Sequence, residues 1–160
     1  MSRVGIGYDI HPFAAGRRMV LCGVEFPGEQ GLAGHSDADA ALHAITDALL
    51  GAAGLGDIGE HFPPSDERWR DADSADLLRA VVAQLQSRFT IGNVDLTIVG
   101  ERPKVGPRRQ EMRDRLAALL GISPDRVNVK ATTNEQLGAL GRGEGLAALA
   151  VALLEEREQA

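Results

Sequence analysis

Near the start of the chain, one aspartate and two histidines have the residue types of a metal site. Asp9 and His11 stand two residues apart, and His43 follows further along. Two imidazoles and one carboxylate are the ligand set of a catalytic zinc ion that keeps one coordination position open. The pair alone is also typical of a capped turn, so the prediction of zinc binding depends on the third candidate.

The segment before His11 predicts how the first two ligands are presented. Residues 4–11 read VGIGYDIH, and an extended backbone with a period of two would put Asp9 and His11 on one face. Gly5 and Gly7 share that face. Because glycine has no side chain, we expect room there for a bulky ligand beside the metal.

His43 lies in a segment with helical periodicity. Over residues 36–50, the apolar positions that recur at helical spacing are Ala41, Leu42, Ile45, Ala48 and Leu49. Asp39, His43 and Asp47 recur every four residues and share another stripe. Carboxylates one turn away could orient a metal-bound imidazole. A solvated face of polar pairs explains the stripe equally well.

The elements that must position these residues alternate between strand and helix. Strands are predicted at residues 3–8, 18–22, 93–99 and 126–132. Helices are predicted at 36–50, 74–86, 108–120 and 146–156, with Ser74 as an N-cap and Gly121 and Pro124 ending the third. Glycine and proline predict loops at 51–64 and 100–107. The pattern favours a small α/β layer fold with helices over a sheet.

Two segments predict phosphate contacts. The glycine-rich turn 141–145 contains a guanidinium and precedes the predicted last helix, a combination that suits an anion, although a plain connector is as good an interpretation. The second segment offers a cation, two hydroxyls and a carboxylate from Lys130, Thr132, Thr133 and Glu135. These groups suit a hard divalent cation that bridges phosphate oxygens, while an ordinary turn is the alternative.

The composition limits the class of protein. With 160 residues, 44% of them hydrophobic and 25% charged, the chain fits a single domain over 1–160. A formal net charge of -6 and 4% aromatic residues argue against a nucleic-acid partner. The single cysteine, Cys22, excludes an intrachain disulfide and predicts a small buried side chain. Neither a membrane-spanning run nor a leader is found, which predicts a cytoplasmic protein with no membrane partner.

Three longer stretches together resemble one enzyme family. They are GYDIHPF at 7–13, GHSDADAALHAITDALLGAAGLGDIGEHFPPSD at 34–66 and NVKATTNEQLGALGRGEG at 128–145. In order and spacing, over nearly the whole chain, they resemble the 2-C-methyl-D-erythritol 2,4-cyclodiphosphate synthases of non-mevalonate isoprenoid biosynthesis. No nucleotidyltransferase domain precedes them, so we expect the stand-alone enzyme rather than the bifunctional fusion.

The resemblance implies a CMP-releasing lyase that acts on 4-diphosphocytidyl-2-C-methyl-D-erythritol 2-phosphate. The 2-phosphate of this substrate attacks its own β-phosphorus, and such intramolecular positioning can lower a barrier by roughly 7 to 11 kcal/mol at best. An ionised phosphate needs no strong general base. The remaining task is to neutralise clustered negative charge.

The resemblance also implies roles for individual residues. The zinc ligands are Asp9, His11 and His43, the ligand of a second divalent ion (Mg²⁺ or Mn²⁺) is Glu135, and the pair that stabilises the transition state is His35 and Thr133. Substrate contacts near the metal are Asp9, Ile10, His11, His35 and Ser36. Those at the methylerythritol end are Asp57, Ile58, Gly59, Phe62, Pro63, Pro64, Ser65 and Asp66.

The cytidine side of the substrate is implied to meet two loops. The residues concerned are Gly100, Glu101, Arg102, Pro103, Lys104, Val105, Gly106, Ala131, Thr132, Thr133, Asn134 and Glu135, with Ala139 and Arg142 completing the set. Backbone groups there would bind the pyrimidine edge. The identity of the side chains at 100–102 is therefore expected to matter little.

The implied fold is α+β, with one mixed sheet covered on one face by helices. Three copies assemble into a homotrimer with the sheets toward the threefold axis and the active sites between adjacent subunits. Several members of the family hold an isoprenoid diphosphate on that axis, at the arginine that matches Arg142. Ala139 replaces the usual aromatic residue, which leaves catalysis intact and leaves occupation of this cavity open.

Two other functions remain open on the sequence alone. A zinc-dependent phosphohydrolase could use the same three ligands to activate water and would give a linear product. A non-catalytic trimeric module could bind nucleotides or isoprenoid diphosphates at 141–145. Its binding would not depend on Asp9 or His43.

Overall fold

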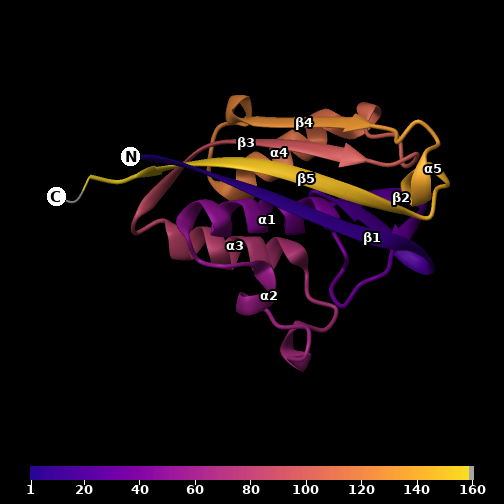
Figure 1. Cartoon of the computed structure of the whole chain (residues 1–160), viewed down its shortest axis with the longest axis horizontal. Coiled ribbons are helices and arrows are strands. Elements are labelled where there is room, and N and C mark those ends of the chain that lie inside the picture. The colour runs from indigo at the N-terminus through magenta and orange to yellow at the C-terminus, as the bar shows by residue number, and fades with distance from the viewer. Residues whose placement is uncertain (159–160) are drawn as a thin grey trace.

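A five-stranded sheet runs through the computed structural model, which describes residues 1–158 (Figure 1). The strands are β1 (Ser2–Leu21), β2 (Val24–Leu32), β3 (Phe89–Val99), β4 (Val127–Thr132) and β5 (Gly145–Glu156), in the spatial order β2-β1-β5-β3-β4. β3 and β4 pair in parallel, while the other neighbours run antiparallel. The predicted mixed sheet of an α+β fold is confirmed.

Helices pack against one face of this sheet. The longer ones are α1 (Ala40–Ala53), α3 (Ser74–Leu85) and α4 (Arg109–Leu120), and they confirm three predicted helices. Short elements that the sequence did not predict are α2 (Ile58–His61) and η2 (Gly106–Arg108), in the two predicted loops, and η1 (Glu67–Trp69), η3 (Pro124–Arg126) and α5 (Gly138–Gly141) outside them. The N-cap of α3 is Asp73, one residue before the predicted cap. α4 ends at a left-handed Gly121, as predicted.

The helix predicted at 146–156 is wrong, because this segment is the central strand β5. It pairs with β1 on one edge and with β3 on the other. Alternate residues Leu146, Ala148 and Ala150 are buried toward the helices. A run of alanine and leucine fits a buried helix or a buried strand equally well, and pairing on both edges decides for the strand. The turn 141–145 therefore precedes a strand, and the predicted anion site at a helix N-terminus is also wrong.

β1 joins the two strands predicted at 3–8 and 18–22. Residues 2–12 pair with β5, and the later part pairs with β2. The prediction misses β2 altogether. Its Pro27 and Gly28 are residue types that strands rarely contain, and an edge position tolerates them.

Two glycines of β1 lie directly against the backbone of α1. A Cβ atom on Gly5 would stand 2.0 Å from the carbonyl oxygen of Ala48, and one on Gly7 would stand 1.9 Å from that of Ala44. The expected room for a ligand is therefore wrong, because the helix fills it. The close approach brings the helix with His43 next to the strand with the other two ligand candidates.

The opposite face of the sheet is apolar and uncovered in the protomer. On β1, the side chains of Val4, Ile6, Tyr8 and Ile10 are between 47% and 69% exposed, and Val151 on β5 is 42% exposed. A contiguous apolar patch of this kind marks an interaction surface. Within residues 1–158, none of the helices has the length and apolar character needed to cross a membrane.

Candidate metal centre and active site

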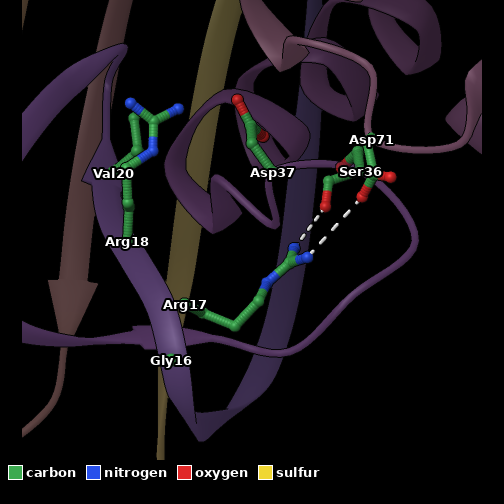
Figure 2. A pocket seen from close by; sticks show the side chains of 7 residues that line it. All are labelled: Gly16, Arg17, Arg18, Val20, Ser36, Asp37 and Asp71. Atoms are coloured by element: carbon green, nitrogen blue, oxygen red, sulfur yellow. Dashed lines mark hydrogen bonds and ion pairs between the residues drawn. The ribbon is translucent and has the colours of Figure 1, made fainter.

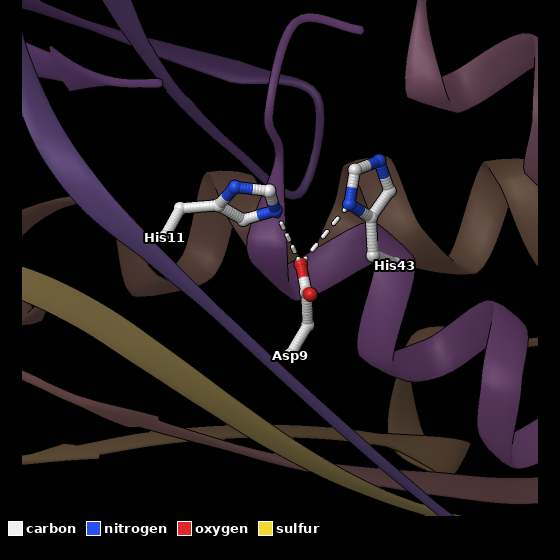
Figure 3. Close-up of side chains that lie close together, drawn as sticks. All are labelled: Asp9, His11 and His43. Carbon is white, nitrogen blue, oxygen red and sulfur yellow. Dashed lines mark hydrogen bonds and ion pairs between the residues drawn. The ribbon is translucent and has the colours of Figure 1, made fainter. Parts of the chain in front are cut away.

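Asp9, His11 and His43 converge between β1 and α1 (Figure 3). Oδ2 of Asp9 lies 2.8 Å from Nε2 of His11 and 3.0 Å from Nδ1 of His43. One ligand atom from each residue lies within 4.8 Å of the other two. The strand period and the helix thus bring together the three residues predicted as metal ligands.

The His11 ring is oriented by the backbone behind it. Its Nδ1 lies 2.7 Å from the carbonyl oxygen of Ala33, which can only accept, so Nδ1 carries the hydrogen. Nε2 then keeps its lone pair. This nitrogen is buried and has no aligned hydrogen-bond partner among residues 1–158. A divalent ion bound beside Asp9 would satisfy it, so the donor set fits zinc.

Asp9 and His11 have shifted pKa values. Burial raises the pKa of Asp9, but contacts with His11 and His43 outweigh burial and lower this pKa to about 2. Burial lowers the pKa of His11, whereas Asp9 and the Ala33 carbonyl raise it, and the net direction is upward. Asp9 therefore stays ionised at neutral pH, and zinc binds the neutral form of His11.

The carboxylates of the predicted polar stripe on α1 do not orient His43. Asp39 is the buried N-cap of α1 and accepts hydrogen bonds from the N–H groups of Cys22, Gly23 and Leu42. Burial raises the pKa of Asp39 to about 7. Asp47 accepts from the N–H of Ile58 at 2.8 Å. The predicted role of the two carboxylates is wrong, and Cys22 is a buried side chain as expected.

Arg17 of β1 fastens the loop that carries His35 and Ser36 (Figure 2). Its guanidinium donates to the carbonyl oxygens of Leu32 and Ser36 and stands 3.7 Å from a carboxylate oxygen of Asp71. Arg17, Ser36 and Asp71 also line a cavity of about 240 Å³. The loop that bears His35 and Ser36 is thereby held to β1.

A second cavity of about 170 Å³ lies beside the metal ligands. Predicted residues that line it are His11, His35, Ser36, His43, Ile58, Gly59, Phe62 and Pro64. Trp69 and Leu77 also line it and were missed by sequence reasoning. The Trp69 and Phe62 rings meet edge to face, with centroids 5.0 Å apart. The only tryptophan of the chain stands three residues after the implied substrate contacts 62–66, and this is a signal that could have found Trp69.

Other residues of this region that were predicted to contact the substrate instead cap short helices or face solvent. Asp57 caps α2, and Asp66 caps η1 and pairs with Arg68. The side chain of Ile10 lies on the exposed face of β1, opposite the ligands. The predicted residues of this region that do not line the cavity are Asp9, Ile10, Asp57, Pro63, Ser65 and Asp66.

A second cluster forms where β3 and β4 end. The Thr133 hydroxyl lies 3.4 Å from Glu135 Oε1, and Glu135 has a left-handed φ of 50°. Glu101 accepts hydrogen bonds from the N–H groups of Asn134 and Gln136 at 3.2 and 3.1 Å. The structure thus joins the predicted loops 100–106 and 131–135, and it corrects the expectation that side chains at 100–102 matter little, because Glu101 holds the second loop.

The remaining predicted residues lie near this cluster or on the surface. Val105 is buried in the core, and Lys104 is exposed. Ala139 lies in α5, and Arg142 Nε stands 2.6 Å from Glu144. No hydrogen bond or ion pair within residues 1–158 joins the metal ligands to Thr133 or Glu135. Both clusters nevertheless lie at the same end of the sheet (Figure 1).

Comparison with known proteins gives one consistent family. The model of the YgbB family matches residues 2–155. A 2-C-methyl-D-erythritol 2,4-cyclodiphosphate synthase from Symbiobacterium thermophilum is 59% identical over 155 residues, which are 96% of this chain and 99% of the relative.

Solved structures agree with this result. The bifunctional IspDF of Campylobacter jejuni matches with a TM-score of 0.95 and 39% identity, over 99% of this chain and 43% of that longer protein. IspF of Plasmodium falciparum, solved as a CDP complex, matches with a TM-score of 0.86 and 31% identity, over 98% of this chain and 97% of its own.

Proposed function

Because the chain belongs to the YgbB family of 2-C-methyl-D-erythritol 2,4-cyclodiphosphate synthases, we propose that Asp9, His11 and His43 hold the zinc ion of its active site. The chain is a cyclising lyase of non-mevalonate isoprenoid biosynthesis. It converts 4-diphosphocytidyl-2-C-methyl-D-erythritol 2-phosphate to the 2,4-cyclodiphosphate and releases CMP. The convergence of the three ligand candidates beside a cavity carries the proposal.

The reaction depends more on neutralising the negative charge of the phosphates than on proton transfer. An oxygen of the 2-phosphate forms a bond to the β-phosphorus, and the bond to the CMP oxygen breaks, with CMP taking the electron pair. Bound zinc supplies positive charge that polarises a phosphoryl group. The cavity walls then have to hold the flexible substrate so that the attacking and leaving oxygens lie in line.

His35 provides a donor for this charge. Its Nε2 is buried and has no hydrogen-bond partner among residues 1–158. It lines the same cavity as His11 and His43. In the tautomer that has its hydrogen on Nε2, His35 can donate to a phosphoryl oxygen as negative charge develops. We assign His35 and Thr133 to stabilisation of the transition state.

Metal removal tests this function. We expect release of CMP to stop when the purified protein is stripped with a chelator, and to return only when zinc is supplied together with Mg²⁺ or Mn²⁺. The physical reason is that clustered phosphates need positive charge to react with one another. Turnover by the stripped protein would contradict the proposal.

Glu135 is proposed to hold the second divalent ion. Its carboxylate and the Thr133 hydroxyl are adjacent oxygen ligands, which suit Mg²⁺. We expect Glu135→Gln, which keeps the size and removes the charge, to need roughly tenfold or more Mg²⁺ or Mn²⁺ for half-maximal rate while its zinc content stays the same. Glu111→Gln on α4 is the matched control. An unchanged metal titration for Glu135→Gln would refute the assignment.

We further propose a homotrimer whose uncovered sheet faces meet at the threefold axis. Burial of Val4, Ile6 and Tyr8 would give such an interface its apolar core. Adjacent subunits would then complete one site, with the metal cluster of one protomer and the cluster around Thr133 of the next. This arrangement explains why no hydrogen bond or ion pair joins the two clusters within residues 1–158 of one protomer.

Light scattering tests the assembly. We expect a mass three times that of the chain, and we expect Ile6→Glu to dissociate the assembly, because a charge would be buried at the axis. Ala80→Glu, on the exposed side of α3, places the same charge on the helix side and should stay trimeric. A monomer with full activity would rule out a site shared between subunits.

Three finer points remain proposals. Residues 100–106 and 131–135 are assigned to the cytidine end, and a relative of similar fold binds CDP. Occupation of the threefold axis by an isoprenoid diphosphate stays open, because Ala139 offers no aromatic surface and Arg142 already pairs with Glu144. Cytoplasmic localisation stays a prediction.

A further inference from the structure

On the side of the His43 ring away from Asp9, Nε2 contacts two serine hydroxyls, and one of them contacts a carboxylate in turn. Nε2 of His43 lies 2.8 Å from Oγ of Ser74 and 3.1 Å from Oγ of Ser36. Oγ of Ser74 in turn makes a hydrogen bond with Oδ1 of Asp37. Both serines are buried. The three partners come from the start of α3 and from the loop before α1, so two separate segments converge behind one ring.

Asp37 is fixed as an acceptor in this chain of contacts. Its Oδ1 also accepts from the N–H of Asp39, and its Oδ2 accepts from the N–H of Ser74, both at 3.1 Å. A carboxylate that accepts on both oxygens has no hydrogen to give. The hydrogen between the two side chains therefore belongs to Ser74, whose hydroxyl donates to Asp37 and turns its lone pairs toward His43.

The orientation of the Ser74 hydroxyl indicates which ring nitrogen of His43 carries the hydrogen. A lone pair of Ser74 Oγ at 2.8 Å favours a hydrogen on Nε2, and this is the tautomer that leaves Nδ1 free to bind zinc. Nδ1 then keeps its own lone pair, and it is the nitrogen that faces Asp9. His11 is set in the opposite way, because its Nδ1 donates to Ala33 and its Nε2 faces Asp9. Each ring would thus present a lone pair to a zinc ion bound beside Asp9.

We propose that Ser74 and Asp37 are positioning residues that act through His43, a role that rests on the proposed zinc centre. The hydrogen-bond chain from His43 through Ser74 to Asp37 holds the ring in the tautomer and orientation that zinc needs. A negative charge behind a metal-bound imidazole also makes the ring nitrogen that faces the metal a stronger electron-pair donor to it. Here the charge acts through an inserted hydroxyl instead of by direct contact.

Ring nitrogen NMR on the zinc-loaded wild-type protein tests the tautomer directly. We expect the hydrogen on Nε2 of His43 and on Nδ1 of His11, with the other nitrogen of each ring bound to zinc. A hydrogen on Nδ1 of His43 would overturn the proposal.

Zinc affinity tests whether Ser74 and Asp37 strengthen the binding of zinc. In competition with a chromophoric chelator, we expect the dissociation constant for zinc to rise about 10- to 100-fold in Ser74→Ala and in Asp37→Asn. Ser123→Ala is the matched control, because it removes another serine hydroxyl that donates to a carboxylate, that of Asp125, outside the metal centre. Thermal unfolding of the zinc-free variants establishes that each is folded.

The outcomes separate this proposal from the metal centre itself. A zinc affinity for Ser74→Ala within twofold of wild type would overturn the role of the chain and leave the zinc site standing. Failure of the wild-type protein to bind zinc would overturn the centre, and the proposal that depends on it would fall with it. If Ser74→Ala did not fold, Asp37→Asn and the wild-type tautomer would decide.

Discussion

Zinc should be absent from the His43→Ala protein, and its kcat/KM should fall by at least about 10²- to 10³-fold, the loss typical of removing one preorganised electrostatic contact. Asp9 and His11 alone would leave two protein ligands, one fewer than catalytic zinc sites use. Metal analysis of the purified variant and the rate of CMP release measure the two effects.

His61→Ala is the matched control for this substitution. His61 is the remaining histidine of the chain, and its Nε2 lies 2.8 Å from the carbonyl oxygen of Leu55, away from the metal ligands. This variant should keep one zinc ion per chain. Stoichiometric zinc in His43→Ala would contradict the assignment of the ligand.

Gly7→Ala should destabilise the protein by about 3 kcal/mol or more, at the upper end of the cost of overpacking. The added Cβ would stand 1.9 Å from the carbonyl oxygen of Ala44, and a backbone group cannot rotate away as a side chain can. α1 would have to move off β1. Since Asp9 is on the strand and His43 on the helix, that movement should weaken zinc binding too.

Gly51→Ala is a control within the same helix and has the opposite expected sign. The nearest atom to a Cβ there is the Ile6 carbonyl oxygen at 3.9 Å, so the change should stabilise the helix by about 0.5–1 kcal/mol. Denaturant unfolding of the zinc-free proteins at one concentration measures both free energies. A Gly7→Ala protein as stable as wild type would show that α1 does not pack on β1 as described.

Sequence reasoning could predict the metal ligands because they depend on local geometry. An extended segment must put Asp9 and His11 on one side, and the periodicity around His43 predicts its helix. Caps and apolar periodicity likewise predict α1, α3 and α4. In each of these cases, the deciding interactions lie within a few residues of one another.

Features decided by partners far along the chain could not be predicted. β5 is a strand because β1 and β3 pair with its two edges, and no local pattern distinguishes it from a helix of alanine and leucine. The glycines of β1 looked like space for a ligand, although the space belongs to α1. Ser74 reaches His43 from 31 positions away, so only the folded chain identifies it as a partner of the ring.

Phosphorus NMR on the purified wild-type protein, with the cytidine diphosphate substrate, zinc and magnesium, tests the central claim most directly. Two mutually coupled signals of a cyclic diphosphate should appear together with the single signal of CMP. A linear phosphate product would contradict intramolecular attack and indicate a metal-dependent hydrolase. Bound substrate that never turns over would contradict catalysis and indicate a binding module.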